Sequence, residues 1–119
     1  MNWKTLYHYL KSAGFDVYSI GQHKGVCESP YIVLRNNGTN IVDSVADRHY
    51  EIMMYVPVDR YSEMEDFVES VKLNMSKLWP HVLLYEDEAP HYLDDEKKAY
   101  MTSLIYRVPK VARYLVPNE

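Results

Sequence analysis

The chain has 119 residues, of which 47% are hydrophobic and 25% charged, so it has the size and composition of one ordinary folded domain and not of a disordered segment. Its formal net charge is −4 and it carries no basic stripe, which disfavours sequence-specific binding of nucleic acid. A single cysteine, an N-terminus without an apolar leader and the lack of a long apolar run predict no internal disulfide, no signal peptide and no membrane span, as expected in a reducing cytoplasm.

The N-terminal segment predicts a helix over residues 2–13. Its apolar residues recur at helical spacing, Asn2 can cap the start, and Gly14 suits the left-handed position just past the end. Residues 15–20 alternate weakly in polarity and predict a short strand. Residues 21–29 are polar and contain two glycines, which is typical of a loop.

The next segment predicts a strand, a tight turn and a returning strand. Residues 30–35 are rich in β-branched and aromatic side chains, and the proline stands at the first position, where a strand tolerates it. Residues 36–39 contain Asn-Gly, the strongest short signal for a hairpin turn, so the returning strand is expected to begin within residues 39–45. Residues 48–56 predict a long strand with apolar side chains on both faces, which is typical of a central strand.

The clearest helix is expected after a break at residues 57–61. Ser62 and Glu65 have the spacing of a capping box, and Pro80 is expected to stop the helix. An apolar stripe runs between them. It consists of Met64, Phe67, Val68, Val71, Met75, Leu78 and Trp79. Acidic residues lie early in this segment and lysines late, which complements the helix dipole.

The C-terminal third predicts two further strands. Residues 81–85 form a short apolar strand candidate, and residues 86–98 are expected to be a charged loop. Residues 99–108 alternate over a longer stretch and predict the last strand, which Pro109 is expected to end. Residues 110–119 are expected to form a C-terminal tail, either docked or loose.

These elements predict a single α+β domain over residues 1–119. Their order is α-β-β-α-β-β, and the expected sheet is mostly antiparallel, with four to five strands and two helices packed on one face. The chain contains twelve tyrosines but only two Phe and two Trp. Tyrosine suits both a half-buried rim and a surface covered by a partner, so Tyr55, Tyr100 and Tyr106 on the predicted strands are candidate interface aromatics.

Motifs for catalysis or cofactor binding are not found in the sequence. There is no Gly-rich phosphate loop, no paired-His metal motif on a helix and no nucleophile elbow, which predicts a protein that is not an enzyme and holds no cofactor or metal. The five histidines are scattered, without metal-ligand spacing. Cys27 follows His23 by four residues, but a loop cysteine without a special environment is a simpler interpretation than a nucleophilic pair.

An acidic segment, residues 86–96, is the most distinctive charged feature. Its six carboxylates are those of Glu86, Asp87, Glu88, Asp94, Asp95 and Glu96. Clustered carboxylates can bind a hard cation such as calcium, but the spacing differs from that of the helix–loop–helix calcium loop and the central glycine is missing. A solvated loop is the simplest interpretation. A third interpretation, beside the cation site and the solvated loop, is a loop at an interface or facing a channel, where its negative charge would repel DNA.

Four stretches carry a resemblance to a known family. They are SPYIVL (29–34), YEIMMYVP (50–57), SEMEDFVESVK (62–72) and AYMTSLIY (99–106). Over most of residues 15–108 the chain resembles the tail completion, or tail terminator, proteins of long-tailed bacteriophages and prophages, together with the related head–tail joining and minor capsid proteins.

The resemblance implies a structural protein of virion assembly without catalytic residues. Such a protein forms a homo-oligomeric ring, often a hexamer, at the head-proximal end of the tail tube. The ring stops tube polymerisation and docks to the head connector, first in the bacterial host cytoplasm and then in the neck of the virion. The alternative function is a small non-enzymatic adaptor or regulatory domain that binds another protein.

Overall fold

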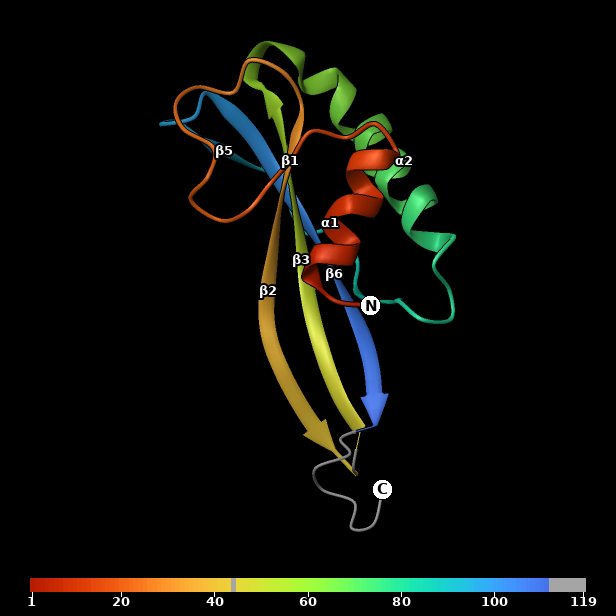
Figure 1. Ribbon diagram of the computed structural model, residues 1–119. Helices are drawn as coiled ribbons and strands as arrows, with labels where there is room; N and C mark the ends of the chain where they lie inside the picture. Colours follow the sequence, from red (N-terminus) through yellow and green to blue (C-terminus); the bar gives the residue numbers. More distant parts are fainter. Residues whose placement is uncertain (44, 112–119) are drawn as a thin grey trace.

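A six-stranded sheet with two helices on one side forms the framework of the protein in the computed structural model, which describes residues 1–43 and 45–111 (Figure 1). The elements in chain order are α1 (Trp3–Ser12), β1 (Val17–Tyr18), β2 (Tyr31–Val42), β3 (Val45–Pro57), the 3-10 helix η1 (Val58–Glu63), α2 (Met64–Ser76), β4 (Leu83–Glu86), β5 (Tyr92–Asp94) and β6 (Ala99–Val111). Neither α1 nor α2, nor any other helix of the described residues, is long and apolar enough to cross a membrane.

The sheet is mixed, which corrects the expectation of a mostly antiparallel sheet. Its strand order is β1-β2-β3-β6-β4, and β5 pairs with β6 beside β4. β1 runs parallel to β2, whereas the other pairs are antiparallel. The order along the chain is α-β-β-β-α-β-β-β and not α-β-β-α-β-β. The prediction failed because β1 and β5 are two and three residues long, too short for a periodic pattern to show how they pair.

The Asn-Gly sequence forms a β-bulge and not the expected hairpin turn. β2 continues through it, with a shift of register between Asn36 and Gly38. The Asn36 Oδ1 atom accepts a hydrogen bond from the Gly38 N–H at 2.8 Å, and Gly38 has a φ of 99°. The hairpin instead turns after Val42, where Asp43 has a φ of 49°. A residue pair that accepts positive φ suits a bulge as well as a turn, so the local signal alone did not decide between them.

The last strand continues past Pro109, contrary to the prediction that this proline ends it. β6 pairs with β3 as far as Val111, and Pro109 lies opposite Asp47. β4 reaches only Arg107 of β6, so Pro109 lies where β6 forms the edge of the described sheet. An edge strand tolerates proline because the missing N–H need not remove a ladder bond. Most of the predicted tail, residues 112–119, lies outside the described residues.

The main core lies between the sheet and the helices. The predicted central strand is confirmed, since β3 lies between β2 and β6. Its residues Tyr50, Ile52, Met54 and Val56 are fully buried under the helices. The predicted cap of the first helix also forms, because the Asn2 Oδ1 atom accepts a hydrogen bond from the Thr5 N–H at 2.9 Å.

The predicted apolar stripe of α2 is mostly buried, with Phe67 and Leu78 only partly so. The fully buried residues are Met64, Val68, Val71 and Met75. Trp79, in contrast, is 71% exposed, because α2 ends at Ser76 and the chain leaves the helical path. The capping box is not formed, since no side chain caps α2 and η1 runs directly into it.

A second, smaller core lies on the other face of the sheet. It contains Cys27, Tyr31, Val33, Tyr55, Ala99 and Met101. The segment joining β1 to β2 covers part of this face, because the His23 ring stacks on the Tyr31 ring with centroids 3.9 Å apart. The Cys27 N–H donates to the Lys97 carbonyl at 2.7 Å and ties this segment to the far edge of the sheet. The chain therefore shields part of its own second sheet face.

The buried tyrosines predict a loss of stability at high pH. Burial raises the pKa of Tyr55 and that of Tyr106 to about 12, from an ordinary value of 10.0. Above pH 10 the unfolded chain releases these phenolic protons while the folded chain keeps them, so the unfolded state binds fewer protons and the free energy of unfolding falls. We expect this free energy to fall between pH 10 and about 12 in urea titrations, as a consequence of the raised pKa values. The fall should be smaller in a Tyr55→Phe/Tyr106→Phe variant, and an identical fall would contradict the prediction.

Candidate interaction site

A three-stranded arm projects beyond the helices (Figure 1). It consists of residues 36–42 of β2, 45–49 of β3 and 107–111 of β6. Beyond the bulge the strands remain paired to the tip, where Val45 lies opposite both Val42 and Val111. The arm contributes to the elongated shape of the molecule, which measures 56 × 26 × 25 Å. Side chains on both faces of the arm are exposed to solvent.

The two faces of the arm differ in their side chains. Alternation from the buried Tyr50 places Ala46 and Arg48 on the side of the helices, and the cross-strand register adds Ile41, opposite Ala46. Val45 points to the opposite side by the same alternation. Ile41 is 40% exposed and Val45 37% exposed, so each face presents an apolar side chain near the tip.

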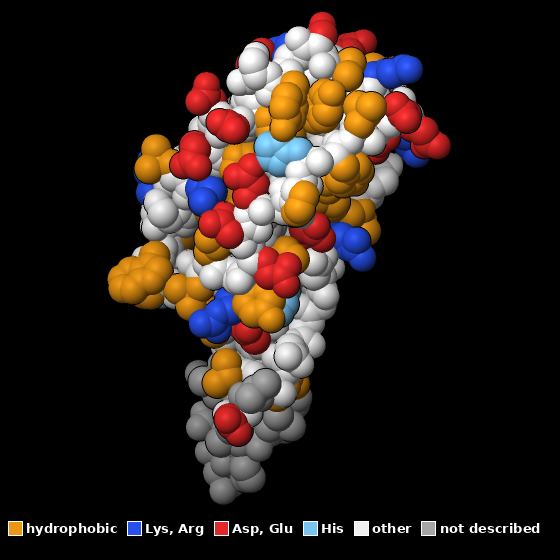
Figure 2. Space-filling view, turned by 180° about the vertical axis from the view of Figure 1, so that it is seen from behind, with side chains coloured by type: hydrophobic (Ala, Val, Ile, Leu, Met, Phe, Trp, Pro, Cys, Tyr) orange, Lys and Arg blue, Asp and Glu red, His pale blue; other side chains and the backbone are white. Residues whose placement is uncertain are grey.

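Polar contacts hold the base of the arm on the face away from the helices. The His49 Nε2 atom lies 3.2 Å from the Asp47 Oδ2 atom, and the Arg107 guanidinium lies 3.4 Å from the Asp47 Oδ1 atom. The His49 ring also contacts the Tyr85 ring, with centroids 4.4 Å apart. Seen from behind, the wide part of the molecule carries hydrophobic and acidic side chains interspersed, with lysines and arginines scattered among them (Figure 2).

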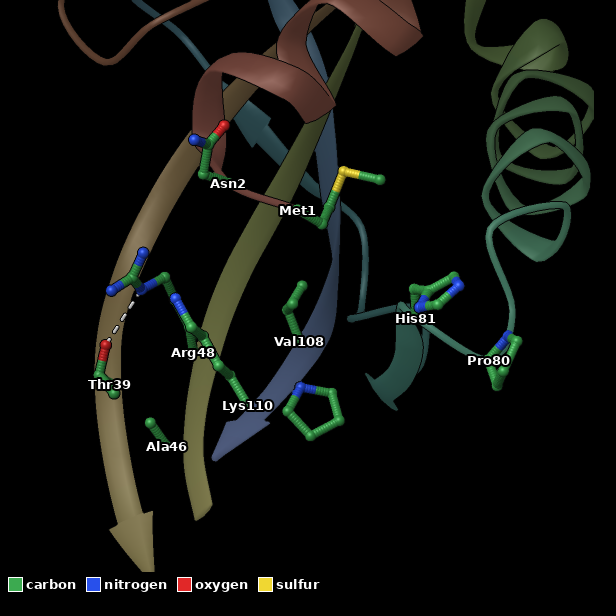
Figure 3. A pocket seen from close by; sticks show the side chains of 10 residues that line it. Met1, Asn2, Thr39, Ala46, Arg48, Pro80, His81, Val108 and Lys110 are labelled. Atoms are coloured by element: carbon green, nitrogen blue, oxygen red, sulfur yellow. Dashed lines mark hydrogen bonds between the residues drawn. The ribbon is translucent and has the colours of Figure 1, made fainter. Parts of the chain in front are cut away.

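An open hollow of about 680 Å³ lies where the arm leaves the helices (Figure 3). Its lining residues are Met1, Asn2, Thr39, Ala46, Arg48, Pro80, His81, Val108, Pro109 and Lys110. The Arg48 Nε–H donates to the Thr39 Oγ1 atom at 3.2 Å across the floor. Arg48, Lys110 and His81 supply basic groups, and no carboxylate of the described residues lines the hollow. It is a basic site on a chain whose net charge is −4.

The acidic segment is not the single charged loop that was predicted. Glu86 ends β4, and Asp94 ends β5, which lies within the expected loop. The Asp87 Oδ1 atom lies 3.0 Å from the Lys72 Nζ atom of α2. A hydrogen bond from the Glu88 N–H and another from Lys72 lower the pKa of Asp87. Among the described residues, no group of three or more potential ligands could hold a metal ion.

The other acidic residues fall into two groups. Glu88 is bonded to His91, whose Nδ1 atom lies 2.8 Å from the Tyr61 hydroxyl. Asp95 and Glu96 are exposed in the turn between β5 and β6. The structure thus divides the six carboxylates among two strand ends, two pairs with basic side chains and one exposed turn.

Two of the three candidate interface tyrosines are buried. Tyr55 is 7% exposed and stacks on Tyr31 at 4.8 Å, while Tyr106 is 4% exposed in the core under the helices. Tyr100 is half-buried and contacts Tyr61, with ring centroids 4.4 Å apart. Among the residues that the structure describes, Trp79 is the most exposed large aromatic side chain, although the sequence predicted it to be part of the apolar stripe.

Cys27 and His23 lie in the same segment but form no hydrogen bond with each other among the described residues. The Cys27 Sγ atom contacts the Ser29 carbonyl at 3.2 Å, and burial raises the pKa of its thiol. Burial, and secondarily the positive charge of Lys97, lower the pKa of His23. An activated cysteine nucleophile has a lowered pKa, so this environment opposes activation.

An apolar hollow of about 440 Å³ lies between α2 and β4. Its lining residues are Lys72, Met75, Ser76, Trp79, Val82, Leu84 and Tyr106. Trp79 and Leu84 are exposed at its margin. Sequence reasoning missed this hollow because the expected helix extended past Ser76 and kept Trp79 in the core.

Comparisons of the chain with protein-family models and with curated proteins find no match. Sequence reasoning also missed the arm and its basic hollow. The available signal was the continued alternation of Thr39 and Ile41 after the Asn-Gly bulge, which is typical of a strand.

Proposed function

We propose that the protein is a structural subunit of bacteriophage assembly, without enzymatic activity. In this role it is a tail terminator, tail completion or head–tail joining protein that forms a homo-oligomeric ring, caps the tail tube and docks to the head connector. The observation that carries the proposal is the arm, a three-stranded β-structure that extends past the helices and exposes side chains on both faces. The resemblance of the sequence to tail completion proteins is the second support.

The arm suits a ring because it offers different surfaces on its two sides. A ring subunit has a neighbour on each side, and each contact joins two different patches. Ile41 and Val45 on opposite faces give each neighbour an apolar contact. The outer edge of β2 has a strand partner only at Ile32 and Val33 within the described part of the chain. The rest of that edge can accept a strand from a neighbouring subunit.

Electron microscopy of the protein mixed with polymerising tail-tube protein from the same phage or prophage tests the proposal. The genes beside its own identify that tube protein. We expect rings at one end of each tube and a reduced mean tube length, because a bound ring prevents further addition. Bovine serum albumin at the same concentration is the control. Bare ends and unchanged tube lengths at saturating protein would contradict the proposed function.

The second candidate function is a small adaptor domain that binds another protein. The apolar hollow beside α2 favours it, because the exposed Trp79 is the kind of side chain that anchors protein interfaces. The tube experiment separates the two candidates. An adaptor leaves the tubes uncapped, whereas a ring subunit shortens them.

A further inference from the structure

The basic hollow on the arm has the size and charge of a docking site. Its volume of about 680 Å³ lies in the range of pockets that hold ligands. Arg48 and Lys110 rise from the same face of adjacent strands, since Arg48 lies opposite Val108, two residues before Lys110. Diagonal neighbours of this kind are about 7–8 Å apart, so one acidic segment can contact both.

The Arg48 side chain is held at one nitrogen and has N–H groups left to bind a carboxylate. Its Nε–H donates to the Thr39 Oγ1 atom, as the dashed line in Figure 3 shows. Its terminal nitrogens make no hydrogen bond or ion pair within the described ranges of the chain. A planar guanidinium with free N–H groups binds carboxylates through paired, charge-assisted hydrogen bonds. The chemistry of the hollow therefore favours an acidic peptide segment.

The acidic turn, which we define as residues Asp94, Asp95 and Glu96, is the segment of this chain that matches the hollow best. Asp95 and Glu96 are exposed and form no ion pair with any described residue, whereas Asp87 and Glu88 already have partners. The acidic turn connects the paired strands β5 and β6 at one end of β6. The Asp94 Oδ1 atom accepts a hydrogen bond from the Lys97 N–H at 3.1 Å, so Asp95 and Glu96 are the carboxylates of this turn that remain free for a contact.

The acidic turn and the hollow cannot meet within one chain. Asp94 pairs with Ala99 at the start of β6, and Lys110 lies near the end of the same strand. The strand advances by eleven residues from Ala99 to Lys110, which corresponds to about 36 Å. The longest side chains span only a fraction of that distance, so the contact requires a second molecule.

We propose that the hollow on the arm binds the acidic turn of a second copy of this chain. The proposal rests on the self-assembly in the proposed function and names its two surfaces. Arg48 and Lys110 of one copy bind the carboxylates of Asp95 and Glu96 of the next. The two surfaces are different and lie at different ends of the molecule, so the contact is head-to-tail, as a closed ring requires.

Sedimentation velocity over a range of concentrations tests the contact on the full chain. We expect oligomers at low salt and weaker association at high salt, because screening weakens exposed charge pairs. The Arg48→Glu/Lys110→Glu variant and the Asp95→Lys/Glu96→Lys variant should each associate at least about tenfold more weakly, since both place like charges together. The Lys4→Glu/Lys11→Glu variant makes the same charge change as the first on exposed positions of α1 and should associate like the wild type.

Mixing the two charge-reversed variants gives the decisive result. Each variant then offers the surface that complements the other, so association should return to the wild-type range. A mixture that stays dissociated, although circular dichroism shows both variants folded, overturns the contact. A wild-type chain that stays monomeric at every concentration also overturns it. The tube-capping experiment tests the proposed function independently of this contact. If the chain caps tubes although one of these results has overturned the contact, it still has the proposed function, and its copies bind through other surfaces.

Discussion

Replacing Leu104 with alanine is expected to lower the free energy of unfolding by about 2–5 kcal/mol. Leu104 is fully buried in β6 opposite Ile52 of β3, in the core between the sheet and the helices. Removing its three outer carbon atoms loses burial and leaves a cavity, because neighbours held by the sheet relax only partly. Urea unfolding followed by circular dichroism measures the change.

The next residue of the same strand provides the matched control. Ile105 points to the opposite face of the sheet and is half-buried. The Ile105→Ala variant removes a similar volume but is expected to cost less than half as much, since part of that side chain already contacts water. Equal losses in the two variants would contradict a main core on the helix side.

Placing lysine at both apolar tip positions of the arm is expected to abolish tube capping while the protein stays folded. In the Ile41→Lys/Val45→Lys variant each face of the arm carries a charge where a neighbouring subunit would bury an apolar side chain. An unpaired buried charge is expensive, so each contact should be lost. The positions are exposed in the single chain, and we expect the free energy of unfolding to change by no more than about 1 kcal/mol.

Two exposed apolar residues outside the arm serve as the control for this variant. Ile20 and Val26 lie between β1 and β2, and the Ile20→Lys/Val26→Lys variant makes the same chemical change there. Electron microscopy should show capped tubes with the control and bare ends with the arm variant. Normal capping by both variants would exclude the arm tip as the interface.

The helices and the central strand could be predicted from the sequence because their signals are local. The cap at Asn2 depends on Thr5, three residues away, and the positive φ of Gly14 follows directly after the helix. The alternation in β3 separates its two faces over nine residues that lie next to each other in the chain. Such patterns depend on the geometry of a single element, which the neighbouring elements do not change.

The prediction failed where the same residues suit two different local structures. Asn36 and Gly38 suit a hairpin turn and a β-bulge equally well. The bulge forms because β2 continues past Gly38 and pairs with β3, as Thr39 does with Arg48. This pairing forms only when the whole hairpin assembles. Trp79 has helical spacing to Met75, yet it is exposed because α2 ends at Ser76.

The candidate site was less predictable than the fold. The acidic segment was found from the sequence, but its division into paired and exposed carboxylates depends on Lys72 of α2 and on His91, which contacts Tyr61 of η1. The basic hollow combines residues from the N-terminus, β2, β3, the segment after α2, and β6. Arg48 and Lys110 are separated by 61 intervening residues in the sequence but lie on adjacent strands, so no local pattern joins them.

By itself, the sequence determined an α+β chain with two helices, a buried central strand and an acidic segment. Each of these depends on spacing within one element or on composition. The tertiary structure alone decided the parallel pairing of β1, the extension of three strands into an arm and the basic hollow at its base. These depend on where the helical layer ends relative to the strands, a relation between distant segments that local periodicity does not encode.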